Sequence, residues 1–98
     1  METPLHLPDS KSPNSIREVI NALEKQGLFP THDKKAWGDW INLSGVDTVI
    51  SIESVRSLAR MATIESAEGD PEEVRGNIIA AFASLGWYGS DEDGEYQL

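Results

Sequence analysis

The amino-acid sequence predicts an α+β fold: two amphipathic helices, or three if one ambiguous segment is also helical, packed on one face of a small, mainly antiparallel sheet. Two segments carry apolar residues at helical spacing between capping residues and a terminal glycine. Two β-rich runs flank a short turn, and the last twelve residues contain the hairpin turn Asp93-Gly94. A chain of 98 residues has the usual length of one domain with one core.

Residues 1–12 are predicted to form a flexible N-terminal arm, and residues 13–98 to form the single α+β domain. Prolines and polar residues dominate the arm, so it has little apolar surface to offset the entropy lost on ordering. His6 lies in this arm and is expected to have no fixed neighbours.

The first helix is predicted over residues 13–26. Ser12-Pro13 offers a cap and a first-turn proline, and Ser15 with Glu18 fits a capping box. Gly27 is expected to end the helix in a left-handed conformation, with Leu28-Phe29 packing back onto it. The apolar stripe consists of Ile16, Val19, Ile20 and Leu23.

A β-hairpin is predicted over residues 36–52. Its two runs, Ala36–Leu43 and Val46–Ile52, are rich in Trp, Val, Ile and Thr, and Ser44-Gly45 between them can form a two-residue turn. The next segment, Glu53–Ser66, is ambiguous, because its apolar residues fit a helical stripe and also alternate passably as in a strand. Its good helix formers favour a third helix, and a third strand is the alternative.

The second helix is predicted over residues 71–85, with Asp70 as its cap, Pro71 at its first position and Gly86 as its terminator. Gly76 lies inside this helix, where glycine costs about 1 kcal/mol relative to alanine. Close packing against a neighbouring backbone is the expected reason for it. The core stripe consists of Val74, Ile78, Ala81, Phe82 and Leu85.

The chain is predicted to end in a hairpin over residues 87–98. Pairing about Asp93-Gly94 sets Glu92 opposite Glu95 and Gly89 opposite Leu98. Strand alternation then places Gly89, Tyr96 and Leu98 on one face, and Tyr88, Ser90, Glu95 and Gln97 on the other.

Most of the net charge of −9 belongs to the C-terminal third of the chain. Residues 1–64 hold seven basic and eight acidic residues, whereas residues 65–98 hold one basic and nine acidic residues. Such a surface repels the phosphates of DNA and RNA, so direct nucleic-acid binding is disfavoured. It attracts a basic protein partner instead.

Four carboxylates, those of Asp91, Glu92, Asp93 and Glu95, gather at the predicted hairpin tip. The simplest interpretation is a solvated turn that protects the sheet edge from aggregation, and docking onto basic residues of a partner and metal binding are the alternatives. An EF-hand calcium loop is disfavoured, because Glu95 stands where that loop requires glycine. No cofactor or metal is predicted.

Trp37 and Trp40 are the second pair of candidate binding residues. On a strand they face opposite sides, so one of them is exposed unless both faces of the sheet are covered. Burial under the N-terminal arm or a helix is one interpretation, and a binding surface or a homodimer contact is the other.

Catalytic chemistry has little support in the sequence. His6 lies in the predicted arm, and His32 lies beside Asp33 in a polar turn, so neither is visibly held against a substrate. No serine has the glycine-flanked context of a hydrolase nucleophile, and no phosphate-binding glycine loop is present. The absence of cysteine suits a reducing compartment, and with no apolar run of membrane-spanning or signal-peptide length a cytoplasmic location is expected.

Two hypotheses of different classes follow. The first is an acidic protein-interaction or inhibitory module, such as an immunity-type antagonist or an adaptor, with nucleic-acid mimicry as a variant. The second is a small enzyme or ligand-binding domain that uses Trp37, Trp40 and nearby carboxylates. A folded domain without a specific site remains the third alternative.

Overall fold

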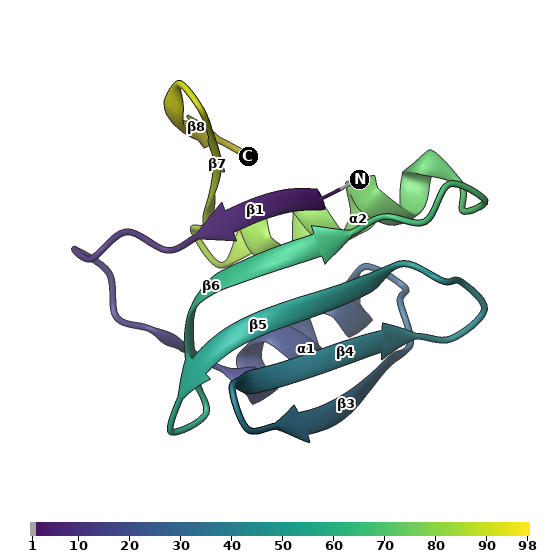
Figure 1. Cartoon of the computed structure of the whole chain (residues 1–98), viewed down its shortest axis with the longest axis horizontal. Coiled ribbons are helices and arrows are strands. Elements are labelled where there is room, and N and C mark those ends of the chain that lie inside the picture. Colours follow the sequence, from purple (N-terminus) through teal and green to yellow (C-terminus); the bar gives the residue numbers. More distant parts are fainter. Residues whose placement is uncertain (1) are drawn as a thin grey trace.

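The computed structural model describes residues 2–98 as an open, antiparallel, eight-stranded sheet with two helices (Figure 1). The order of strands across the sheet is β3-β4-β5-β6-β1-β7-β8, and the short β2 pairs with β6 off this path. The strands are β1 (Glu2–His6), β2 (Asn14–Ser15), β3 (Pro30–Lys35), β4 (Gly38–Leu43), β5 (Val49–Val55), β6 (Leu58–Glu65), β7 (Tyr88–Asp91) and β8 (Gly94–Gln97).

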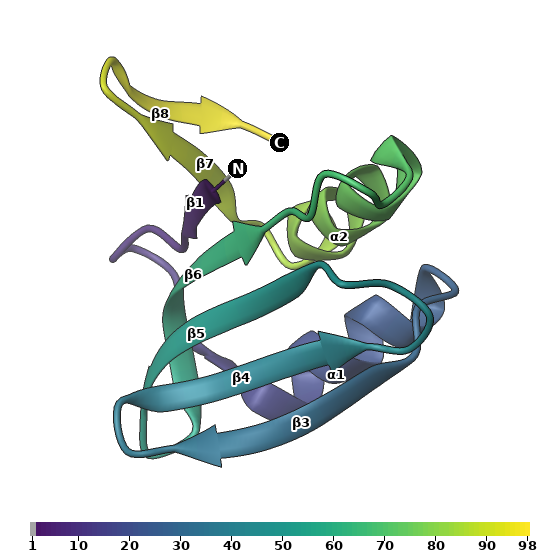
Figure 2. The same ribbon diagram turned by 45° about the vertical axis from the view of Figure 1, so that its right-hand side comes forward.

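Both helices, α1 (Ile16–Lys25) and α2 (Glu72–Ser84), lie on the same side of the sheet (Figures 1 and 2). The predicted α+β class and antiparallel sheet are therefore confirmed. In residues 2–98 no helix covers the opposite side, which we call the open face. The predicted third helix is absent from the described residues.

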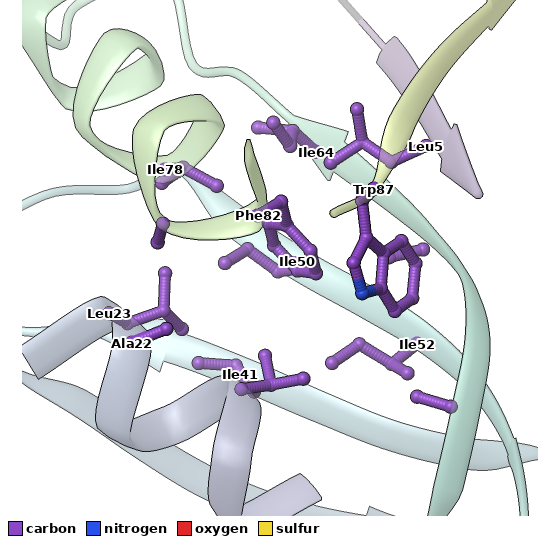
Figure 3. Packing of buried hydrophobic residues seen from close by; sticks show 14 of the residues in the cluster. Leu5, Ala22, Leu23, Ile41, Ile50, Ile52, Ile64, Ile78, Phe82 and Trp87 are labelled. Carbon is purple, nitrogen blue, oxygen red and sulfur yellow. The ribbon is translucent and has the colours of Figure 1, made fainter. Parts of the chain in front are cut away.

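The hydrophobic core fills the space between the two helices and the sheet (Figure 3). Phe82 of α2 packs edge-to-face against Trp87, with ring centroids 4.9 Å apart. The indole nitrogen of Trp87 donates a hydrogen bond to Asn14, so this buried tryptophan is fully satisfied. Along β4, β5 and β6, the residues that point toward the helices are buried in this core. The residues that alternate with them point to the open face.

The start and end signals of α1 are largely confirmed. The hydroxyl of Ser15 accepts a hydrogen bond from the backbone of Glu18, whose carboxylate accepts one from the backbone of Ser15. The helix begins at Ile16 rather than at residue 13, because Asn14 and Ser15 pair with β6. Gly27 has a φ of 84° and ends the helix, as predicted. Leu28 packs on the core, but Phe29 is exposed.

The predicted cap of α2 is wrong. Pro71 occupies the N-cap position without a side-chain hydrogen bond. The carboxylate of Asp70 instead accepts hydrogen bonds from the backbone of Asp47 and from the backbone and hydroxyl of Thr48. Asp70 therefore fixes the loop between β4 and β5. The core stripe is confirmed for Val74, Ile78, Ala81 and Phe82.

Residues 2–7, which the sequence placed in a flexible arm, are paired with the sheet. Residues Glu2–His6 form β1, which pairs with β6 over its whole length and with β7 at Leu5 and His6. Thr3, Leu5 and Leu7 are buried, and this apolar alternation stabilises the strand in spite of its proline. Pro4 is tolerated because β7 pairs with no residue before Leu5.

The predicted central hairpin is present as β4 and β5, although its connection runs over residues 44–48 and not only over Ser44-Gly45. Strand β3, which the sequence did not indicate, pairs with β4 through a tight turn at Ala36-Trp37. Trp37 therefore lies in a turn rather than in a strand. His32 is likewise part of β3 and not of a polar turn.

The helix favoured for Glu53–Ser66 is wrong, and the strand alternative is right. Residues Leu58–Glu65 form β6, which pairs with β5 and β1. A register shift between Glu53 and Ser54 leaves one extra residue in β6, so its inward residues are Ala59, Ala62 and Ile64. This bulge produces the spacing of three that resembles a helix.

The terminal hairpin is present with a different register. Gly89 pairs with Tyr96 and Asp91 with Gly94, so the turn residues are Glu92 and Asp93. Relative to the predicted pairing the second strand is displaced by two residues, which leaves the assignment of side chains to the two faces unchanged. Glu92 and Glu95 are consequently not opposite each other.

Candidate functional site

The open face is concave, and its hollow is the candidate site. A cavity of about 610 Å³ lies between the β3–β4 turn and the terminal hairpin. The strands β1, β4, β5, β6 and β8 all contribute to its floor and rim. Its lining includes His6, Trp37, Trp40, Ser51, Glu53, Met61, Thr63, Glu65, Ser90 and Glu95.

Two tryptophans form one wall of this cavity. The rings of Trp37 and Trp40 lie at 84° to each other, with centroids 6.3 Å apart. Trp37 is 50% exposed because it belongs to the turn, and its ring reaches back toward Trp40 on β4. The indole nitrogen of Trp40 donates a hydrogen bond to Asn42, which fixes that ring on the open face. A nearly perpendicular aromatic pair presents π faces on which a cation or an apolar group can bind.

Three carboxylates share the cavity with the tryptophans. Glu53 comes from β5, Glu65 from β6 and Glu95 from β8, so they are brought together only by the fold. Among residues 2–98, the cavity lining includes no lysine or arginine, and its one basic side chain is His6. A negative field confined to a concave surface attracts cations more strongly than the same charges would on a flat surface.

The terminal hairpin is held over the edge of the cavity by the pairing of β7 with β1 and by one side-chain contact. Nε2 of His6 donates a hydrogen bond to Oε1 of Glu95 at 2.7 Å. On the other face of the hairpin, the ring of Tyr96 lies directly over Gly89, where any Cβ would overlap it. The contact with His6 places Glu95 at the rim of the hollow.

A second cavity of about 870 Å³ adjoins the first at the end of β5 and β6. Trp37, Glu53 and Met61 line both cavities, so the two hollows form one continuous surface. The second one is mainly apolar and also contains Val55 and Leu58, which are 74% and 45% exposed. Its basic residues are Arg56 and Arg60.

The structure brings together three of the six side chains that the sequence singled out: Trp37, Trp40 and Glu95. Asp91, Glu92 and Asp93 do not line either cavity and lie at the exposed turn, where Oδ1 of Asp91 accepts a hydrogen bond from the backbone of Asp93. Sequence reasoning missed His6, Glu53, Met61 and Glu65. Their alternation would have pointed to the open face if residues 2–6 and 58–65 had been assigned as strands.

A second polar cluster lies on the helix side of the sheet. The buried carboxylate of Asp39 accepts a hydrogen bond from Nε2 of His32 at 2.5 Å and another from the hydroxyl of Ser54. Burial raises the pKa of Asp39, but the hydrogen bonds from Ser54 and His32, together with Lys34, outweigh it and lower the pKa overall. Because the hydroxyl of Ser54 donates its hydrogen bond to Asp39 and not to His32, this arrangement does not activate Ser54 as a nucleophile.

Within residues 2–98, no three His, Asp or Glu side chains are grouped as ligands for a metal ion. Neither helix in that range has the length and apolar character needed to cross a membrane.

Comparison with known proteins gives no relative: the chain matches no protein-family model, no curated protein and no solved structure.

Proposed function

We propose that this chain is a protein-interaction module whose open sheet face binds a basic segment of another protein. The observation that carries the proposal is the lining of the concave site: two tryptophans and three carboxylates without a lysine or arginine. Arginine and lysine side chains combine a positive charge with an apolar stem, and such a surface complements both parts.

The breadth of the surface favours a protein segment over a small molecule. The two hollows are open and continuous and extend across most strands of the sheet. Small-molecule sites bury most of the ligand in an enclosed pocket. The negative net charge of the chain also speeds the encounter with a basic partner.

Isothermal titration calorimetry with the nonapeptide acetyl-(Arg-Ser-Gly)3-amide tests the proposal. We expect this basic peptide to bind, and the charge-reversed peptide acetyl-(Glu-Ser-Gly)3-amide not to bind. Raising the salt concentration from about 20 to about 500 mM is expected to weaken binding markedly, since screening acts on exposed charges. Equal affinity for the two peptides would contradict the proposal, and so would arginine amide binding as tightly as the peptide.

A pair of charge-matched variants locates the binding surface. Glu53→Gln removes a carboxylate from the cavity and is expected to weaken binding of the basic peptide about threefold, as for one exposed ion pair. Glu24→Gln removes the same charge from the exposed surface of α1, on the helix side, and is expected to leave affinity nearly unchanged. Equal effects of the two variants would show that net charge alone, and not this site, attracts the peptide.

A further inference from the structure

The second cavity is lined by exposed apolar side chains, which attraction between charges alone does not explain. Of the six large hydrophobic side chains that residues 2–98 expose, four line this one cavity: Trp37, Val55, Leu58 and Met61. Exposed apolar side chains scattered singly are ordinary, but four lining one hollow mark a binding surface.

The charges of the two cavities differ in sign. The first has Glu53, Glu65 and Glu95 in its lining, whereas the second has Arg56 and Arg60 beside Glu53 alone. Arg60 donates a hydrogen bond to the carbonyl oxygen of Pro8, while Arg56 makes no ion pair within the described part of the chain. A continuous run of basic residues would therefore be attracted to the first cavity and repelled from the second.

We infer that the recognised segment carries a cationic residue and, two positions away, an apolar one, with the cation in the Trp37–Trp40 cavity and the apolar side chain on Val55 and Leu58. This inference rests on the proposed function and specifies its ligand. Trp37, Glu53 and Met61 form the boundary between the two subsites, because they line both hollows. An extended peptide places alternate side chains on one side about 7 Å apart, which suits adjoining subsites.

The test compares three nonapeptides by calorimetry: acetyl-(Arg-Leu-Gly)3-amide, acetyl-(Arg-Ser-Gly)3-amide and acetyl-(Glu-Leu-Gly)3-amide. The arginine–leucine peptide is expected to bind about tenfold more tightly than the arginine–serine peptide, the effect of burying one leucine side chain. Equal binding of these two overturns the inference and leaves the proposed function standing. Failure of both to bind better than the glutamate–leucine peptide overturns the proposed function itself.

A surface variant provides an independent check. The double substitution Val55→Ser and Leu58→Ser is expected to remove the preference for leucine while leaving affinity for the arginine–serine peptide unchanged. Phe29→Ser, which alters an exposed hydrophobic residue outside both cavities, is the matched control and should leave all three affinities unchanged. A persistent leucine preference in the double variant, with its fold verified by circular dichroism, would place the apolar contact elsewhere and overturn the inference.

Discussion

Gly38 allows β4 to lie unusually close to β5 beside the tryptophan cavity. A Cβ at this position would overlap the carbonyl oxygen of Ile52, which belongs to a paired backbone and cannot move away cheaply. Gly38→Ala is therefore expected to lower the free energy of unfolding by about 2 kcal/mol, within the usual cost of overpacking. Urea denaturation measures this, and an unchanged midpoint would contradict the close approach.

Gly76, unlike Gly38, has free space around its Cα. It is exposed, and a Cβ at this position would meet no atom within 4 Å, so the close packing expected from the sequence is wrong. Alanine is favoured over glycine inside a helix, and Gly76→Ala is expected to raise the free energy of unfolding by about 1 kcal/mol. The same urea experiment checks it. A loss of stability would reveal a contact of Gly76 that the structure does not contain.

Asp70 links the β4–β5 loop to the start of α2, and this link depends on pH. The hydrogen bond from the Thr48 hydroxyl lowers the pKa of Asp70, burial raises it in part, and the backbone N–H groups of Asp47 and Thr48 lower it further. A folded-state pKa below the unfolded value near 3.8 means that the stabilisation is complete above that value and is lost as the pH falls through the folded pKa.

We therefore expect Asp70→Asn to lower stability at neutral pH and to flatten the loss of stability on acidification between about pH 5 and about pH 2. Asp9→Asn removes the same charge from an exposed position and serves as the control. Unfolding curves at several pH values provide the measurement. Parallel pH profiles of wild type and Asp70→Asn would refute the assignment.

At the scale of elements, the β5–β6 turn is built from unfavourable residues. Arg56 and Ser57 have φ values of 55° and 63°, the left-handed conformation in which an asparagine–glycine pair is preferred. The carbonyl of Ser57 accepts a hydrogen bond from the backbone of Ile16, which holds the turn against the start of α1. The strain lies at the rim of the second cavity, where Arg56 is part of the lining.

The double substitution Arg56→Asn and Ser57→Gly, which introduces the preferred asparagine–glycine pair, is expected to raise the free energy of unfolding by about 1 kcal/mol. The substitution removes the backbone strain of two non-glycine residues in the left-handed conformation. This gain outweighs the larger conformational entropy that glycine gives to the unfolded chain. Thermal denaturation checks the gain. A decrease in the melting temperature would show that the side chains of Arg56 and Ser57 stabilise the turn.

The elements that sequence reasoning found are those with local signals. The capping box at Ser15, the terminal glycines and most residues of the helical stripes depend on neighbours a few residues away and were predicted correctly. Strand β1 was missed because two prolines and a histidine suggested an arm, while its stability comes from pairing with β6. The bulge in β6 depends on a partner strand in the same way, so its effect on the apolar spacing was not visible in one segment.

In the whole molecule, the carboxylates that line the candidate site are mostly not those that the sequence indicated. The sequence placed the acidic excess in residues 65–98 and the candidate binding carboxylates at the hairpin tip, yet the carboxylates that share the hollow with Trp37 and Trp40 come from β5, β6 and β8. Only Glu95 belongs to both groups. This grouping depends on strand order, since β1 lies between β6 and β7, and no local pattern in the chain specifies that order.

An NMR titration of the ¹⁵N-labelled protein with acetyl-(Arg-Ser-Gly)3-amide tests most directly whether the open face binds a basic segment. We expect shifts for the indole N–H groups of Trp37 and Trp40 and for amides of β4, β5, β6 and β8 around the cavity. No shift is expected for the indole of Trp87, which is buried and hydrogen-bonded to Asn14, or for the amides of α1 and α2. Shifts on the helices, or only at Glu92 and Asp93, would contradict a binding site on the open face.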